Sequence, residues 1–232
     1  MDGVMLLNRI DTKYVIHEEE LSGFLQALAD QYNLLLIDGK SIHPYETLYF
    51  DTPGFHLYLM HHNGKWNRYK IRSRKYVNSG TFFFEIKSKT NTNRTHKNRM
   101  MVEEFPETLS VLMEEYINQH TPGRFQQYIP ALRVFFDRIT LVNKQSNERL
   151  TFDLNLRYKN PDGEKKFENL VIVEVKQEKH SFSPCKALMK LNRIQNNNLS
   201  KYCLGISCLN KAIKRNRFKE KIRDLTKLGY EI

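Results

Sequence analysis

Apolar residues recur along the chain in two different rhythms. At Leu21, Phe24, Leu25 and Leu28 they lie three or four positions apart and follow the acidic residues 18–20, which predicts an amphipathic helix that begins at the acids. The same rhythm predicts helices at residues 109–117, after Ser183-Pro184 and, with few apolar positions, in the basic stretch 211–227. Each predicted helix has an apolar side that must pack on another part of the protein.

Other segments alternate strictly, and their polar positions are charged. Residues 66–74 place Arg68, Lys70, Arg72 and Arg74 on one face, and residues 81–89 oppose an apolar face to a charged one. This alternation predicts strands with one buried side. The predicted strands are the opening segment from residue 9, then residues 46–51, 66–74, 81–89, 131–140, 149–157 and 171–178, and a weaker one at 204–209.

The order of these elements predicts the fold class. Because the strands follow one another through short connections, the sheet should be mainly antiparallel. Several polar faces are rich in Arg, Lys and Glu, which favours a closed barrel with a charged lumen over a sheet whose polar face is merely solvated. We predict an α+β fold: an antiparallel β-barrel of about eight strands with helices packed outside. Residues 1–209 would form this domain, and residues 210–232 a basic helix packed on it.

Composition narrows the setting. The 232 residues are 40% hydrophobic and 27% charged, as in ordinary globular proteins. The longest aliphatic run, residues 34–37, is far below the ~20 residues of a membrane span, and residues 1–7 lack the basic start of a signal peptide. We therefore expect no transmembrane segment and a cytoplasmic protein. The three cysteines are expected to be reduced thiols, and His61-His62 a surface or loop pair.

The charge balance points to an anionic partner. Lys and Arg number 37 against 26 acids, a net charge of +11. Residues 211–227 carry eight bases and two acids, and this stretch could contact acidic lipid or an emerging polyanion. Nucleic acid, an anionic membrane or a phosphate-rich ligand could each match such a charge. Nucleic-acid binding would need the cations on an outer face, whereas the alternation favours the inside, so no specific nucleic-acid partner is expected.

An acid-x-Lys unit recurs on the predicted strands. It is found at residues 11–13, 85–87 and 174–176, where a spacing of two puts acid and lysine on the same face. Converging Arg and Lys side chains suit phosphate oxygens, and interspersed carboxylates suit Mg²⁺ or Mn²⁺. This combination indicates phosphoryl transfer, which depends on positioning and charge neutralisation rather than on a protein nucleophile.

At these residues the chain resembles a known family. The matching stretches are Arg9-Ile10-Asp11-Thr12-Lys13-Tyr14, Tyr49-Phe50-Asp51-Thr52-Pro53, Lys70-Ile71-Arg72-Ser73-Arg74-Lys75-Tyr76, Glu85-Ile86-Lys87, Lys97-Asn98-Arg99, Pro130 with Arg138, Arg149-Leu150-Thr151-Phe152-Asp153, Glu174-Val175-Lys176 and Ser200-Lys201-Tyr202. They resemble the polyphosphate polymerase domain of the vacuolar transporter chaperone (VTC) type, within the triphosphate tunnel metalloenzymes. Asp11 stands where that family more often has Glu, and the chain is similar to its compact bacterial form.

The resemblance implies a tunnel that binds ATP or another nucleoside triphosphate with Mn²⁺ or Mg²⁺. The γ-phosphoryl group would pass to a growing polyphosphate chain, with release of ADP. By position, the catalytic candidates are Lys13, Arg72, Arg74, Lys87, Arg138 and Lys201. The candidates for phosphate or substrate binding are Arg9, Lys70, Lys89, Lys97, Arg99, Arg149, Lys176 and Ser200. Glu174 is the implied metal ligand, and the same strand faces add Glu85, Asp11 and Asp153.

Two other functions stay open at this point. A protein of the same fold could hydrolyse triphosphate or polyphosphate, because only exclusion of water from the attack position separates a polymerase from a hydrolase. A protein that merely binds polyphosphate would also need the cations. The carboxylates argue against pure binding, since they would weaken the attraction for bare phosphate.

Overall fold

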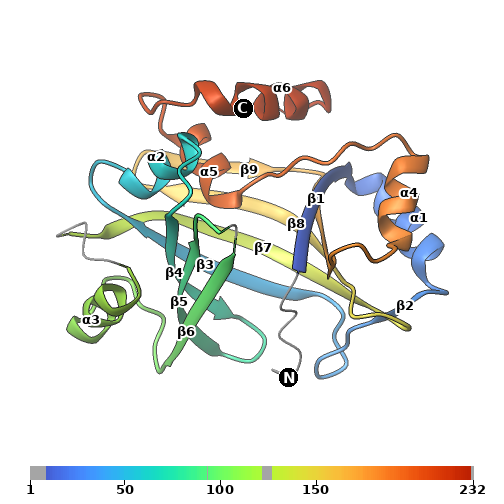
Figure 1. The fold of residues 1–232 in the computed structure, drawn as a ribbon, viewed down its shortest axis with the longest axis horizontal. Coiled ribbons are helices and arrows are strands. Elements are labelled where there is room, and N and C mark those ends of the chain that lie inside the picture. The colour runs from blue at the N-terminus through green and yellow to red at the C-terminus, as the bar shows by residue number, and fades with distance from the viewer. Residues whose placement is uncertain (1–8, 93, 122–126, 231–232) are drawn as a thin grey trace. The chain divides into compact units, whose positions relative to one another are not determined.

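The computed structural model describes residues 9–92, 94–121 and 127–230, and its chain path is shown in Figure 1. Residues cluster into two compact units. Of the described residues, those within 9–43, 136–156 and 167–199 belong to unit 1, and those within 44–135, 157–166 and 200–230 belong to unit 2. Two long strands, β7 (Ile129–Asn143) and β8 (Arg149–Asn160), run through both units.

Unit 1 is a sheet with helices on one face. Its further elements are β1 (Arg9–His17), α1 (Glu18–Leu28), β2 (Tyr32–Leu34), β10 (Leu170–Glu178) and α4 (Pro184–Leu191). The strand order is β1-β10-β8-β7, with β2 also paired to β7. The β1–β10, β10–β8 and β2–β7 pairs are antiparallel. Helix α1 begins where the carboxylate of Glu20 accepts a hydrogen bond from the backbone N–H of His17, 2.8 Å away.

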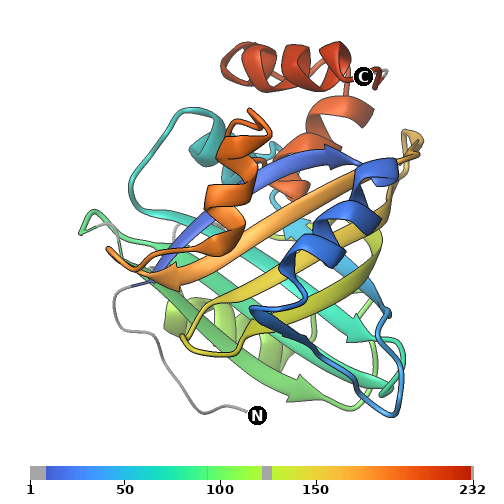
Figure 2. The ribbon, with the colours of Figure 1, turned by 90° about the vertical axis from the view of Figure 1, so that its right-hand side faces the viewer.

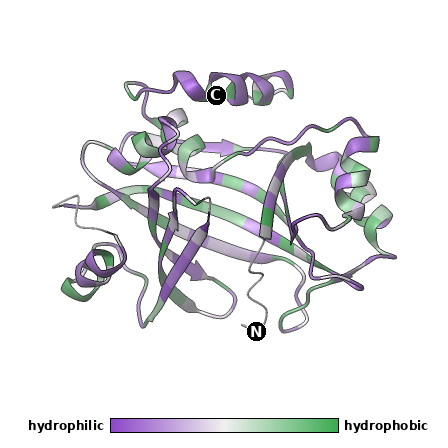
Figure 3. Ribbon diagram, in the orientation of Figure 1, coloured by the Kyte–Doolittle hydropathy of each residue, from purple (hydrophilic) through white to green (hydrophobic). Residues whose placement is uncertain are grey.

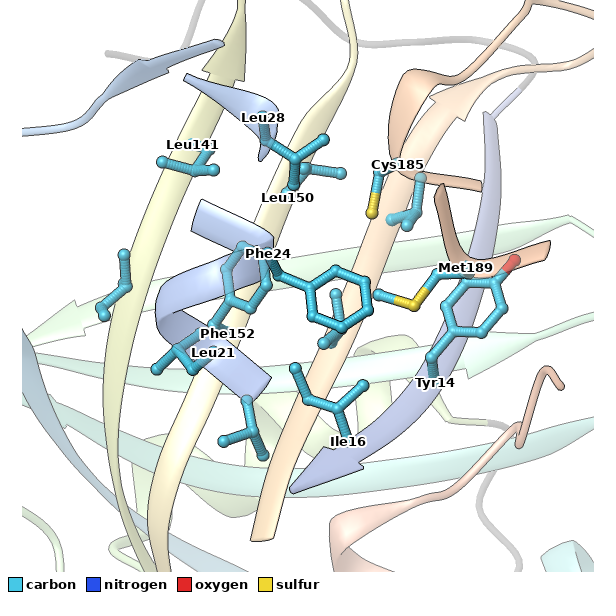
Figure 4. Packing of buried hydrophobic residues seen from close by; sticks show 14 of the residues in the cluster. Tyr14, Ile16, Leu21, Phe24, Leu28, Leu141, Leu150, Phe152, Cys185 and Met189 are labelled. Carbon is cyan, nitrogen blue, oxygen red and sulfur yellow. The ribbon is translucent and has the colours of Figure 1, made fainter. Parts of the chain in front are cut away.

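The core of unit 1 lies on the apolar face of this sheet. Phe24 of α1 and Met189 of α4 pack with Phe152 and Val173 of the strands, as Figure 4 shows for part of the cluster. Figure 2 shows both helices against the same side of β1 and β10. Because side chains alternate along a strand, this packing leaves the charged positions of β1, β10 and β8 together on the opposite face.

The sheet of unit 2 also has one apolar face and one polar face. Its elements are β3 (His43–Asp51), α2 (His56–His62), β4 (Arg68–Tyr76), β5 (Thr81–Lys89), β6 (Thr95–Val102), α3 (Val111–His120), β9 (Gly163–Phe167), α5 (Lys201–Leu209), the 3₁₀ turn η1 (Asn216–Phe218) and α6 (Lys219–Lys227). The order β7-β3-β4-β5-β6 makes its sheet. Phe50, Ile71 and Phe84 form its buried face, covered by Leu57 of α2 and Ile117 of α3.

The predicted α+β class with antiparallel pairing is confirmed, but two details of the sheet are corrected. In the described part of the chain the sheet has ten strands rather than about eight. Among the described residues its order runs from β1 to β6 without a pair that joins these two strands, so the sheet is open and resembles a barrel only approximately. Alternation along a strand indicates which of its faces is buried, but it does not show whether the two edge strands of the sheet pair.

Several predicted elements also need correction. Residues 204–209 are not a strand but belong to helix α5, which Ser200 caps by accepting a hydrogen bond from the Cys203 N–H at 3.3 Å. His61 and His62 lie on helix α2, and His62 is buried. The predicted strand at 66–74 begins at Arg68, and β2, β6 and β9 were not predicted.

The basic C-terminal segment is a shorter helix than predicted. Its helical part α6 is hydrophilic along most of its length in Figure 3, with Leu225 as its buried residue. Ahead of it, the Tyr58 hydroxyl of α2 donates to the Lys214 carbonyl at 3.0 Å, and Arg217 donates to the Asn63 carbonyl at 2.7 Å. The segment is thus anchored to α2 within unit 2. None of the helices in the described part of the chain is long and apolar enough to cross a membrane.

Candidate phosphate-binding site

The polar face of the unit 2 sheet gathers most of the predicted phosphate ligands. Strand register places Lys70 beside Lys87 and Arg72 beside Glu85 across β4 and β5, and places Lys87 beside Lys97 across β5 and β6. We call this surface the cationic face. Among the described residues its bases are Arg68, Lys70, Arg72, Arg74, Lys87, Lys89, Lys97 and Arg99. Glu85 is the acid among them on β4, β5 and β6, so the face carries a net charge of +7.

Glu85 holds two of these cations in place. Its carboxylate is 1% exposed, accepts a hydrogen bond from Arg72 Nε at 2.7 Å, and lies 2.5 Å from Lys97 Nζ. Burial by itself would raise the pKa of Glu85, but Arg72, Arg74 and Lys97 outweigh burial and lower it far below the usual range. Glu85 is therefore an anion throughout the physiological pH range, and it fixes the directions of Arg72 and Lys97.

Tyr49 adds a second contact to Arg72. The Arg72 guanidinium donates to the Tyr49 hydroxyl at 3.2 Å, and the Tyr49 ring stacks on Tyr202 with centroids 4.9 Å apart. Burial would raise the pKa of Tyr49, yet the charges of Arg72, Lys70 and Arg74 lower it to about 8. Arg72 is thus held between a carboxylate and a phenol of perturbed acidity, as is common at functional sites.

The start of helix α5 reaches the same face. Ser200, the N-cap residue, accepts a hydrogen bond from Lys70 Nζ at 2.7 Å, and Lys201 is the first residue of the helix. Backbone N–H groups at a helix N-terminus favour anions. The structure therefore brings Ser200 and Lys70, both predicted as substrate ligands, into direct contact.

Unit 1 carries a second group of charges on its own polar face. Lys13 lies opposite Glu174, and Asp11 opposite Lys176, across β1 and β10. Lys176 Nζ donates to Glu174 Oε2 at 2.7 Å, while Lys13 Nζ lies 4.0 Å from Glu174 Oε1. Burial would raise the pKa of Glu174, but Lys176, Lys13 and Arg138 lower it well below its usual value. We call Asp11, Lys13, Glu174 and Lys176 the acid–lysine cluster.

Arg138 and Asp153 form a separate pair in unit 1. Arg138 donates from Nε and Nη2 to the two carboxylate oxygens of Asp153, at 2.6 and 2.8 Å. Asp153 is fully buried, and such a bidentate geometry fixes the plane of the guanidinium. Asp153 thus fixes the direction of the Arg138 guanidinium, as Glu85 does for Arg72.

Comparison with known proteins identifies the family. A model of the VTC domain matches residues 8–210. The chain belongs to the VTC domain family. No curated protein is significantly similar to it.

Two solved structures are similar to this chain at low identity. A "putative adenylate cyclase" from Bacillus halodurans is 13% identical with a TM-score of 0.52, and the match covers 83% of this chain and 94% of that one. The second structure is the putative adenylyl cyclase HpAC1 from Hippeastrum, reported to have a dominant triphosphatase activity. It is 14% identical with a TM-score of 0.48, and the match covers 86% of this chain and 95% of that one. The first of these supports the tunnel-type fold of the VTC domain.

The carboxylates of this VTC domain differ in how well they fit a divalent metal. No three His, Cys, Asp or Glu side chains in the described residues gather into a metal-binding group. The oxygens of Glu85 and Asp153 are buried and engaged by cations. Glu174 Oε1 lies beyond hydrogen-bond distance of Lys13. A single carboxylate of this kind fits Mg²⁺, which commonly takes one or two carboxylates together with substrate phosphates.

The remaining predicted residues lie along the same two polar faces. Arg149 is exposed and lies opposite Lys176 across β8 and β10. The backbone of Arg9 pairs with Glu178, while its side chain lies outside the described part of the structure. Sequence reasoning missed Tyr49 and Tyr202, although both lie inside stretches that carry the family resemblance. Their positions could have identified them: Tyr49 lies two residues before Asp51, and Tyr202 directly follows Lys201.

Proposed function

We propose that this VTC domain binds ATP by its triphosphate on the cationic face and transfers the γ-phosphoryl group to a growing polyphosphate chain. The observation that carries the proposal is the excess of seven positive charges on one face of the three strands β4, β5 and β6. Such a face is unfavourable without an anionic ligand, because like charges this close repel one another. Phosphate oxygens are the anions that the planar fork of Arg matches best.

The residues of the cationic face supply positioning and charge in this reaction. Arg72, held by Glu85 and Tyr49, and Lys97, held by Glu85, present fixed donors to phosphate oxygens. Lys70 and Ser200 bind a further phosphate at the start of α5, with Lys201 beside them. The bond from the γ-phosphorus to the β,γ-bridging oxygen breaks, its electron pair leaves with ADP, and an oxygen of the acceptor's terminal phosphate forms the new bond. Phosphoryl transfer requires this alignment more than it requires a protein nucleophile.

Glu174 of the acid–lysine cluster is the residue proposed to hold Mg²⁺ or Mn²⁺. A metal bound there would supply a positive charge on the polar face of unit 1 that suits phosphate oxygens. Lys13 and Lys176 keep Glu174 ionised, which a metal ligand requires. Arg138, oriented by Asp153, is the corresponding phosphate donor of unit 1.

We also assign residues 210–232 to the same domain as residues 1–209. The support is the set of contacts between this segment and α2, in which Phe218 packs on Tyr58 with ring centroids 5.8 Å apart. Leu225 of the same segment is fully buried.

The test is an incubation of the purified protein with γ-labelled ATP and Mn²⁺, followed by separation of polyphosphate from orthophosphate. The wild type should make labelled polymer, and Glu174→Gln and Arg72→Ala should each lose it. Glu178→Gln, an exposed acid four residues further along β10, is the matched control and should keep full activity. Orthophosphate without polymer would replace synthesis with triphosphate hydrolysis. No turnover, with ATP still bound, would leave a polyphosphate-binding protein.

A further inference from the structure

Three aromatic side chains lie at one end of the cationic face. The rings of Tyr45 and Tyr76 meet edge to face with centroids 4.9 Å apart, and Tyr76 meets Phe83 in the same way at 5.7 Å. We call Tyr45, Tyr76 and Phe83 the aromatic end. All three are half-buried, so part of each side chain is accessible to solvent or ligand.

Register places the aromatic end on the same face as the phosphate ligands. Tyr45 lies opposite Tyr76 across β3 and β4, and Phe83 lies opposite Arg74 across β4 and β5. The hydrophobic core of unit 2 is on the other face, where Phe84 is fully buried. The aromatic end therefore belongs to the polar face and not to the core.

Cations accompany these rings. The Arg99 guanidinium lies over the Phe83 ring at 4.8 Å, and the Arg74 guanidinium lies over the Tyr45 ring at 5.6 Å. Met101, the cross-strand partner of Phe83, is 68% exposed. Aromatic rings, stacked guanidinium groups and an exposed thioether are the kinds of groups that accept the flat face of a nucleobase.

The spacing also fits a nucleotide. Arg72 and Tyr76 are four residues apart on β4, which corresponds to about 13 Å along the strand. Between the base of an extended nucleoside triphosphate and its terminal phosphates lie the ribose and the α-phosphate, which cover such a gap.

We propose that the aromatic end is a nucleobase subsite, which makes a nucleoside triphosphate the preferred ligand over bare triphosphate. This inference rests on the proposed binding of triphosphate to the cationic face. A purely cationic surface has the opposite preference, because tripolyphosphate carries more negative charge than ATP for the same three phosphates.

Titration calorimetry with ATP and with inorganic tripolyphosphate, each with Mg²⁺, tests the subsite. The wild type should bind ATP more tightly than tripolyphosphate, a result that needs no variant. Phe83→Leu and Tyr76→Leu should each weaken ATP binding about tenfold, the typical effect of losing one stacking partner, and leave tripolyphosphate binding unchanged. Phe82→Leu is the matched control, because Phe82 is on the opposite face of β5, where it packs against Phe105.

The outcomes separate this inference from the proposed function. Equal or tighter binding of tripolyphosphate by the wild type, or equal losses for both ligands in Phe83→Leu, would overturn the base subsite while leaving a triphosphate site. If neither ligand bound the wild type, both the subsite and the triphosphate site would be refuted. A melting curve for each variant shows whether a loss reflects unfolding.

Discussion

The hydroxyl of Tyr202 on α5 donates a hydrogen bond to the buried carboxylate of Asp51 at the end of β3. The same carboxylate accepts the backbone N–H groups of Leu57 and Tyr58, each at 2.8 Å, and so caps the first turn of α2. Because Tyr202 also stacks on Tyr49, one carboxylate links α2 and α5 to the strand beside Arg72. Asp51 lies in a stretch of family resemblance, and this network gives it a positioning role.

Tyr202→Phe should destabilise the protein by about 1–2 kcal/mol, the cost of leaving a buried acceptor with one donor fewer. Urea unfolding measures the change. Tyr116→Phe is the control, since the Tyr116 hydroxyl makes no hydrogen bond within the described part of the chain and its ring packs on Phe84. An equal loss in both variants would show that the hydrogen bond to Asp51 adds nothing.

Glu85→Gln should cost about 3 kcal/mol of stability, because Arg72 and Lys97 would lose their buried counter-charge. The control is Glu164→Gln, which breaks an exposed pair with Arg157 at 3.4 Å and should cost less than about 1 kcal/mol. Tripolyphosphate should stabilise Glu85→Gln more than the wild type, because the anion replaces the missing charge. Thermal melts with and without tripolyphosphate provide the measurement, and an equal gain in both proteins would contradict the role of Glu85.

The stability that Glu85 contributes through its ion pairs with Arg72 and Lys97 should depend on pH. The folded-state pKa of Glu85 lies below the ordinary value of 4.5, so its contribution is complete above about pH 4.5 and is lost as the pH falls through the folded-state pKa. The stability difference between the wild type and Glu85→Gln should therefore shrink on acidification. Urea unfolding at a series of pH values from neutral to acidic tests this, and a constant difference would be inconsistent with the ion pair.

The two faces of the strands could be predicted from sequence, while helices α2 and α5 could not. Alternation at residues 66–74 and 81–89 correctly separated the cations from the core, because a strand with one buried side imposes this pattern. Residues 204–209 alternate in a similar way, yet they are helical. Their conformation depends on the Ser200 cap and on packing against Tyr158, neither of which the alternation reveals.

The sequence also could not predict which charged residues form ion pairs with one another. The acid-x-Lys spacing correctly put Glu85 and Lys87 on one face, but Glu85 pairs with Lys97 of β6 and with Arg72 of β4. These partners lie on neighbouring strands, and β6 has no strong alternation of its own. Which cations each acid contacts depends on the register between strands. Register is set by turns and by packing, and the spacing within one strand does not show it.

Gly205→Ala should destabilise the protein by about 1–3 kcal/mol through overpacking. A methyl group at this position would lie 2.5 Å from a ring carbon of Tyr158 and 2.6 Å from a methyl carbon of Leu132. Gly23→Ala in helix α1 is the matched control, since its methyl group would meet nothing within 4 Å and should add about 0.5–1 kcal/mol of helix propensity. Urea unfolding of the two variants should give changes of opposite sign, and a stabilised Gly205→Ala would show that α5 can move away from Tyr158.

Tyr49 should report directly on anion binding to the cationic face. Its pKa of about 8 exists because Arg72, Lys70 and Arg74 together outweigh its burial, so an anion that neutralises those cations must raise it. Absorbance at the phenolate wavelength, followed through a pH titration, should show a transition near pH 8 that Tyr49→Phe abolishes. Tripolyphosphate should move this transition to higher pH in the wild type. An unmoved transition, with tripolyphosphate binding verified by calorimetry, would place the anion elsewhere and contradict Arg72 as a phosphate ligand.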